Sequence, residues 1–150
     1  MLDQINRRIL RELQESPTIS NAELAAQVGL SPSTCLARLR RLQEAGFIVG
    51  CSALLNPDLL GFPLLVFTEV SLRRGVPWEG FISAVQRLPE IQECHRVAGH
   101  FDYLLKIRAR SLADYRGFIC EQLLVLPCVQ RTLTRVVVED LAVAGKLQLT

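Results

Sequence analysis

Apolar residues recur at helical spacing through three consecutive stretches near the start of the chain. In the third stretch Leu36, Leu39 and Leu42 form one stripe, so these leucines are expected to face a core. The pattern predicts helices over residues 2–15, 21–28 and 32–45.

Helix-end signals separate the second of these helices from the third. Ser20 precedes Glu23 by three residues, which is a capping-box pattern, and Gly29 suits the left-handed conformation that ends a helix. Ser31 and Pro32 give the next helix an N-cap and a proline at its first position. The segment is therefore predicted to be a helix-turn-helix.

From residue 61 onward the pattern predicts strand, helix, strand, strand, helix, strand. This order is typical of a ferredoxin-like βαββαβ domain, so the fold class is α+β, with an N-terminal helix-turn-helix and a C-terminal ferredoxin-like domain. The predicted elements are residues 64–72, 78–88, 91–98, 103–109, 112–126 and 129–139.

A β-rich stretch that ends in the turn-forming pair Asn56 and Pro57 separates the two patterns. We expect one domain over residues 1–47 and a second over residues 61–150, joined by a hinge strand and linker at residues 48–60. Residues 141–150 are expected to form a tail.

Two helices can cover only one face of the predicted sheet. The first strand is apolar on both faces, with Leu65 and Phe67 on the side opposite Val66 and Val70. An exposed apolar face favours self-association, most simply as a two-fold dimer. A dimer would present two helix-turn-helix units, as a palindromic DNA site requires.

The net charge of +2 is too small to indicate a polyanionic partner by itself. Residues 30–42, however, contain three arginines and no acidic residue. The five cysteines are scattered without C-x-x-C spacing, which indicates reduced thiols in a cytoplasmic protein. No apolar run approaches the length of a membrane span and no signal peptide is apparent, so no membrane partner is expected.

The third predicted helix has the features of a DNA-reading helix. Small polar residues at its start allow close approach, and the arginines that fall off its apolar stripe can reach phosphates and base edges. The alternative is an ordinary amphipathic helix with a solvated basic face. The candidate DNA-binding residues are Ser31, Ser33, Thr34, Arg38, Arg40 and Arg41, with Arg40 at the flank of the stripe.

Five stretches, from about residue 2 to about residue 139, occur in the order and at the spacing of a known family. They read LDQINRRIL, LAAQVGLSPSTCLARLRRLQEAGFIVG, LNPDLLGFPLLVF, LPEIQECHRVAGHFDYLLKI and TLTRVVVED. On these stretches the chain resembles the Lrp/AsnC (feast/famine) transcriptional regulators. Two departures from the family pattern are Asn6, where Asp is usual, and Ala37, where many members have Arg.

The resemblance implies a winged-type helix-turn-helix that binds double-stranded promoter DNA, and a C-terminal domain that binds an effector and oligomerises. It implies dimers that assemble further, often into octamers, and amino-acid effectors held between dimers near the turn joining the middle two strands. No other cofactor and no metal are implied. The effector candidates are Gly99, His100, Phe101, Asp102, Tyr103 and Leu104, with Thr132 and Thr134 on the last strand.

The chemistry of this turn allows two interpretations. Free backbone amides near Gly99 can receive a carboxylate, and Asp102 can pair with an ammonium group, as an amino acid requires. Alternatively, the segment is a simple hairpin turn in which Asp102 bonds its own backbone.

An enzyme would have to use Cys94, His95 and His100 as a nucleophile–base pair or a metal site. Neighbouring residues of a strand point to opposite faces, so Cys94 is expected in the core and His95 at the surface. We therefore expect no catalytic or metal-binding residues. A ligand-binding module whose N-terminal helices only mediate protein contacts is a second alternative.

Overall fold

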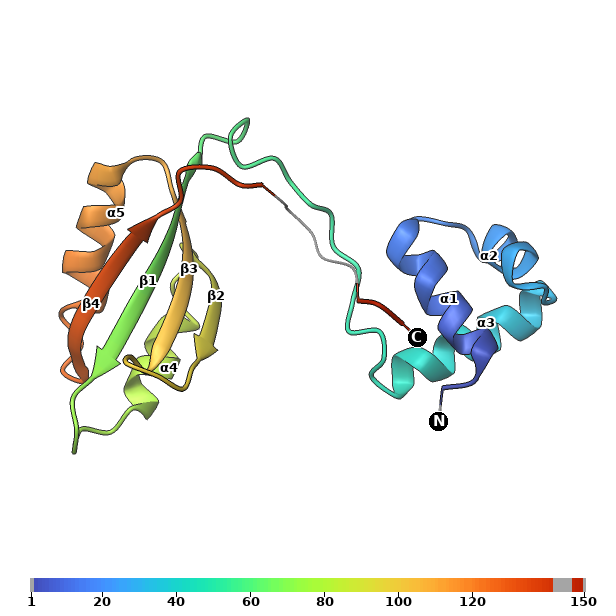
Figure 1. Cartoon of the computed structure of the whole chain (residues 1–150), viewed down its shortest axis with the longest axis horizontal. Coiled ribbons are helices and arrows are strands. Elements are labelled where there is room, and N and C mark those ends of the chain that lie inside the picture. Colours follow the sequence, from blue (N-terminus) through green and yellow to red (C-terminus); the bar gives the residue numbers. More distant parts are fainter. Residues whose placement is uncertain (1, 142–146, 150) are drawn as a thin grey trace. The chain divides into compact units, whose positions relative to one another are not determined.

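The computed structural model describes residues 2–141 and 147–149 and divides the chain into two units (Figure 1). The N-terminal unit comprises residues 1–54 and 142–150, and the sheet unit comprises residues 55–141. Each unit has an apolar cluster of its own. None of the helices in the described part of the chain is long and apolar enough to cross a bilayer.

Three helices, α1 (Gln4–Glu15), α2 (Asn21–Val28) and α3 (Pro32–Glu44), build the N-terminal unit. The predicted end signals are all present: the Ser20–Glu23 capping box starts α2, Gly29 ends it at φ +73°, and the Ser31 hydroxyl caps α3. The N-cap of α1 is Asp3, whose side chain accepts a hydrogen bond from the Asn6 amide. These local signals fix the helix-turn-helix.

The buried side of α3 differs in part from the predicted stripe. Leu42 is buried and Leu39 is half-buried, as expected, but Leu36 is exposed and Cys35 is fully buried in its place. Residues 35, 39 and 42 follow the spacing i, i+4, i+7, which is as compatible with a helix as the predicted spacing. The stripe is thus rotated by one residue at its start.

No strand forms over residues 48–60, which corrects the expected hinge strand. A strand requires a hydrogen-bonded partner, and within the described residues of this chain the segment has none. Val49 is 99% exposed and Leu54 is 80% exposed. The predicted turn is present, because Asn56 Oδ1 accepts hydrogen bonds from the backbone amides of Asp58 and Leu59.

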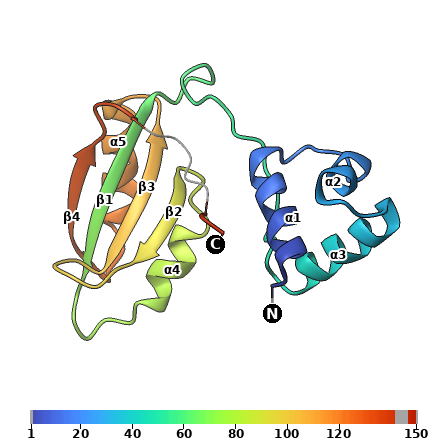
Figure 2. The same cartoon turned by 45° about the vertical axis from the view of Figure 1, so that its right-hand side comes forward.

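The sheet unit confirms the predicted βαββαβ order. Its strands pair in the order β2-β3-β1-β4, and every pairing is antiparallel. Figures 1 and 2 show α4 and α5 on the same side of this sheet. The elements are β1 (Leu64–Leu72), α4 (Glu79–Val85), β2 (Ile91–Arg96), β3 (Tyr103–Ala109), α5 (Leu112–Phe118), the π-helix η1 (Ile119–Leu123) and β4 (Val129–Val136).

The core of the sheet unit lies between the sheet and its helices. Val66, Thr68 and Val70 of β1 and every second residue of β3 are buried there, and Phe81 from α4 lies against Tyr103 with ring centroids 4.9 Å apart. Thr68 is the one buried polar residue of the described core, and its hydroxyl is hydrogen-bonded to the Tyr115 hydroxyl at 2.8 Å.

Several elements of the sheet unit are shorter than predicted. The expected helix over residues 112–126 is α5 followed by η1, where the Leu124 amide donates to the Ile119 carbonyl oxygen five residues earlier. The wider turn keeps Phe118, Ile119 and Leu123 buried together. The helix expected over 78–88 and the strands expected over 91–98 and 129–139 also end earlier, at Val85, Arg96 and Val136.

Residues 147–149 belong to the N-terminal unit, whereas the sequence assigned them to the second domain. The Gln14 side chain accepts from the Leu147 amide at 2.8 Å and donates to the Leu147 carbonyl oxygen at 3.2 Å. Leu149 packs at the edge of the apolar cluster of this unit. Residues 142–146 and 150 of the predicted tail lie outside the described residues.

Candidate nucleic-acid interface and ligand cleft

The N-terminus of α3 carries three exposed hydroxyl groups that contact one another. The Ser31 hydroxyl caps the Thr34 amide at 3.3 Å and is hydrogen-bonded to the Thr34 hydroxyl at 2.8 Å. Ser33 Oγ lies 3.3 Å from Ser31 Oγ. Because all three side chains are exposed, this helix end offers hydroxyl and amide groups to an anion such as a DNA phosphate.

Arg38 lies in the middle of α3 but contacts α1. Its Nη1 donates to Asp3 Oδ2 at 2.5 Å and to Asn6 Oδ1 at 3.0 Å. The side chain of Arg38 is only 29% exposed. Sequence reasoning placed this arginine outward, because helix periodicity does not reveal that the start of α1 lies beside it.

Arg40 and Arg41 are exposed, and no hydrogen bond or ion pair is recorded for either among the described residues. Arg41 borders an open cleft of about 700 Å³ between α1 and α3. Asp3 also borders this cleft, and hydrogen bonds from the Asn6 amide and then from Arg38 lower the pKa of its carboxyl group. The cleft is lined by Asp3, Asn6, Ser33, Thr34, Ala37, Arg38, Arg41, Leu42, Ala45 and Phe47.

The turn between β2 and β3 is fixed to the end of β1 by Asp102. Its carboxylate Oδ2 accepts a hydrogen bond from the Leu72 amide at 2.7 Å, and its own amide donates to the Val70 carbonyl oxygen at 2.9 Å. The side chain therefore bonds a neighbouring strand, which differs from both sequence interpretations. Gly99 has φ +154°, a conformation that side-chain-bearing residues rarely adopt.

A second cleft, of about 420 Å³, opens beside this turn. Four of the effector candidates border this cleft. Sequence reasoning missed the other residues that line it, above all Arg74 and Arg131. The strand order places β4 and the end of β1 next to the turn, so the Arg73–Arg74 doublet after β1 was a usable signal. The lining residues are Ser71, Arg74, Gly99, His100, Phe101, Asp102, Gln130 and Arg131.

The other four effector candidates do not line this cleft. Tyr103 is 4% exposed and belongs to the core, because it starts the buried face of β3. The Thr134 hydroxyl is hydrogen-bonded to the Tyr115 hydroxyl at 2.7 Å and borders a separate hollow beside α5. Leu104 and Thr132 are half-buried strand residues.

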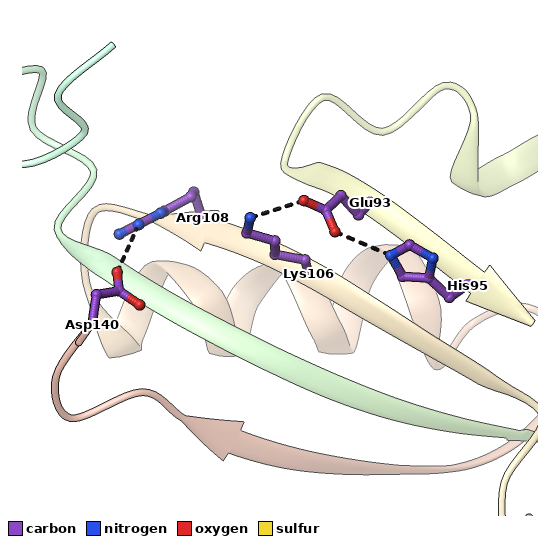
Figure 3. Close-up of polar contacts among 5 residues, drawn as sticks. All are labelled: Glu93, His95, Lys106, Arg108 and Asp140. Atoms are coloured by element: carbon purple, nitrogen blue, oxygen red, sulfur yellow. Dashed lines mark hydrogen bonds and ion pairs between the residues drawn. The ribbon is translucent and has the colours of Figure 1, made fainter. Parts of the chain in front are cut away.

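The helix-free face of the sheet carries ion pairs beside the apolar side chains that were expected there (Figure 3). Glu93 bridges Lys106 at 2.8 Å and His95 at 3.0 Å, and Arg108 pairs with Asp140 at 3.3 Å. The Lys106 ammonium, and then His95, lower the pKa of the Glu93 carboxyl group. The apolar surface on this face comes from Leu133, which is 48% exposed, and from half-buried Phe67 and Leu104.

Cys94 and His95 lie on opposite faces of β2, because they pair with Leu105 and Leu104 of β3. Cys94 is exposed, since β2 is an edge strand, so its expected place in the core was wrong. Partial burial nevertheless raises the pKa of its thiol. Within residues 2–141 and 147–149 no group of three potential metal ligands comes together.

Both units match known protein families. Residues 2–49 match the winged helix-turn-helix DNA-binding family, and residues 65–145 match the Lrp/AsnC ligand-binding domain. The leucine-responsive regulatory protein of Klebsiella pneumoniae is 54% identical over 148 residues, covering 97% of this chain and 90% of that protein. The Escherichia coli K12 protein of the same name is 53% identical over the same coverage.

Solved structures agree with these matches. A transcriptional regulator from Neisseria meningitidis in complex with L-methionine superposes with a TM-score of 0.94 at 33% identity, over 99% of this chain and 97% of that chain. A feast or famine regulatory protein from Mycobacterium tuberculosis, also complexed with L-methionine, has a TM-score of 0.92 at 27% identity over both full chains. The exposed helix-turn-helix, the βαββαβ sheet unit and these relatives together place the chain in the Lrp/AsnC family of DNA-binding transcriptional regulators.

Proposed function

We propose that this regulator reads DNA as a dimer through α3 and responds to an amino acid bound at the cleft beside Asp102. The DNA contacts are inferred from the exposed surface of α3. Its N-terminus presents exposed hydroxyl groups, and its exposed arginines have no recorded partner among the described residues. The proposed contacts are Ser31, Ser33, Thr34, Arg38, Arg40 and Arg41.

The DNA contacts can be tested without knowing the natural operator. Duplexes are selected with the full chain from a random library, and the affinity of the enriched sequence is measured by gel shift at several salt concentrations. Arg41→Ala should weaken binding and reduce the slope of log affinity against log salt by about 1, because one phosphate contact is lost. Arg116→Ala, the same charge change at an exposed site on α5, is the matched control. An unchanged slope for Arg41→Ala would remove it from the interface.

Dimerisation is proposed through the helix-free face of the sheet. This face combines exposed Leu133 and half-buried Phe67 and Leu104 with ion pairs that limit the ways in which two copies can align. Higher assembly, such as an octamer, would build on this dimer, and residues 48–60 would act as the hinge between a DNA-binding domain (residues 1–47) and the second domain. Sedimentation of Leu133→Asp should show a shift toward monomer, and an unchanged dimer would exclude this face.

The effector proposal is supported by the charges around the second cleft. Arg74 and Arg131 provide two cations for a carboxylate, and neither has a recorded hydrogen-bond partner among the described residues. Oδ2 of Asp102 accepts the hydrogen bond from the Leu72 amide, whereas Oδ1 has no hydrogen bond to any described residue and is therefore suited to an ammonium group. These groups match an α-amino acid. The methionine complexes of the two relatives support the same ligand class.

The effector proposal is tested by thermal unfolding of the full chain with each of the twenty amino acids. A ligand that binds the native state raises the unfolding temperature by mass action. Methionine and leucine are the first two probes. The same mixtures are then examined by sedimentation and gel shift, because we propose that the effector acts on assembly in the cytoplasm. If no amino acid alters any of these readouts, an amino-acid effector is excluded.

A further inference from the structure

The contact between Arg38 of α3 and the start of α1 has a consequence for base recognition. Asp3 divides its two carboxylate oxygens: Oδ1 caps α1 through the Asn6 amide at 2.7 Å, and Oδ2 pairs with Arg38 at 2.5 Å. The Asn6 side chain provides a second acceptor to the same guanidinium at 3.0 Å. The first turn of α1 therefore holds an arginine of the helix that we propose as the DNA reader.

Both recorded contacts leave from a single nitrogen of Arg38, Nη1. Among the described residues no hydrogen bond is recorded from its Nε or Nη2. Because a guanidinium is planar, two acceptors on one nitrogen fix the orientation of the remaining N–H edge. Arg38 borders the cleft that Ser33, Thr34 and Arg41 also line. Arg38 is thus oriented before any ligand arrives, whereas exposed Arg41 is not.

The negative charge of Asp3 determines whether Arg38 is better suited to contact a DNA phosphate or a base. A phosphate brought to Arg38 would also approach the ionised carboxylate of Asp3, which repels it. A base edge has no net charge and meets no such repulsion. The free edge of an arginine matches O6 and N7 of guanine, the commonest specific contact in the major groove.

We propose that Asp3 and Asn6 are positioning residues that hold Arg38 so that its Nε–Nη2 edge reads a guanine. This inference rests on the proposed role of α3 as the DNA-reading helix. It assigns a part in base specificity to Asp3, the N-cap of α1, and to Asn6 in the first turn of α1. Arg38 then provides base discrimination with little dependence on salt, because its charge is already paired. Arg41 provides the salt-dependent phosphate contact.

The decisive variant is Asp3→Asn in the full chain. Asparagine caps helices as well as aspartate does, so α1 keeps its N-cap while Arg38 loses its charged partner. The double variant Asp3→Asn with Asn6→Asp returns a carboxylate to the other acceptor of Nη1. Asp58→Asn is the matched control, because it makes the same charge change at an exposed residue outside the N-terminal unit. Thermal unfolding of each variant verifies that the chain still folds.

Affinities are measured for the duplex enriched by the wild type, for all its single base-pair variants and for a scrambled duplex. Asp3→Asn should lose about tenfold in affinity for the enriched duplex and lose discrimination at the same G·C pairs as Arg38→Ala. Binding to the scrambled duplex should stay within about twofold. The double variant should recover most of the loss, and Asp58→Asn should behave as the wild type.

Three results would overturn the inference. Wild-type or tighter binding by Asp3→Asn would mean that Asp3 does not position Arg38 or that it opposes binding. Equal losses on enriched and scrambled duplexes would mean that the pair only supports the fold. Discrimination lost at different base pairs from those of Arg38→Ala would separate the two residues. If the wild type enriches no sequence at all, the proposed function of α3 fails instead, and the two failures are therefore distinguishable.

Discussion

The Arg11 guanidinium of α1 holds the backbone carbonyl oxygen of Leu149, a residue 138 positions later in the chain. Its Nε donates at 2.9 Å, and its Nη2 donates to the same oxygen. Together with the paired amide contacts of Gln14 to Leu147, this contact returns the end of the chain to the DNA-binding unit. The helix α1 therefore also binds a segment that is distant in the sequence.

Deletion of residues 147–150 should loosen α1. Charge-assisted hydrogen bonds at an exposed site contribute about 1 kcal/mol, so amide hydrogen exchange in the C-terminal half of α1 should become about fivefold faster. Exchange in β1 should not change, because β1 belongs to the other unit. Peptide-resolved exchange measured by mass spectrometry checks this, with Arg11→Ala as a milder version of the deletion. Equal exchange in the deleted and intact chains would contradict it.

Asp102→Ala should destabilise the sheet unit by about 1–2 kcal/mol, because the Leu72 amide loses its acceptor. Asp102→Asn should cost less, since its amide oxygen can still accept that hydrogen bond. Urea unfolding followed by the fluorescence of Trp78, the single tryptophan, reports on this unit. Asp58→Ala, an exposed aspartate in the same unit, is the control. A loss no larger than that of the control would show that the turn does not depend on Asp102.

Arg131→Ala should weaken binding of the amino acid identified by thermal screening by about tenfold, because one charge-assisted bond to its carboxylate is lost. Arg74→Ala should act in the same direction. Calorimetric titration measures the affinity, and Arg87→Ala, an exposed arginine that does not line the cleft, should leave it unchanged. Full affinity in both Arg131→Ala and Arg74→Ala would place the carboxylate elsewhere.

Glu93→Gln should make the free energy of unfolding less dependent on pH in the acidic range. Lys106 and then His95 hold the pKa of Glu93 below its ordinary value of 4.5, so its stabilising contribution is present above that pH and is lost as pH falls through the folded-state pKa. The half-exposed pair contributes at most about 0.5 kcal/mol. Urea unfolding of the wild type and of Glu93→Gln, compared between about pH 5 and about pH 3, measures this contribution as the difference between the two chains. A wild-type pH dependence in Glu93→Gln, with Glu121→Gln as the charge-matched control, would refute this assignment.

Local signals in the sequence were sufficient for most of the fold. The capping box at Ser20, the left-handed Gly29 and the cap at Ser31 all act within four residues along the chain, and all are present. Buried residues alternate along β3, and Leu65 and Val66 of β1 are both buried, as expected for a strand that is apolar on both faces. Errors occurred where local patterns were equally compatible with two arrangements, as for Leu36 and Cys35.

The sequence by itself determined the helix-turn-helix, the βαββαβ order and the family, since capping, periodicity and motif spacing are properties of neighbouring residues. Only the tertiary structure decided that Arg38 of α3 is held by another side chain, because its partner Asp3 lies 35 positions away in the sequence. It also decided that Asp102 bonds Leu72 and that Arg74 and Arg131 meet at one cleft. Contacts of this kind depend on how the whole chain folds back on itself, and no local pattern of residues encodes that path.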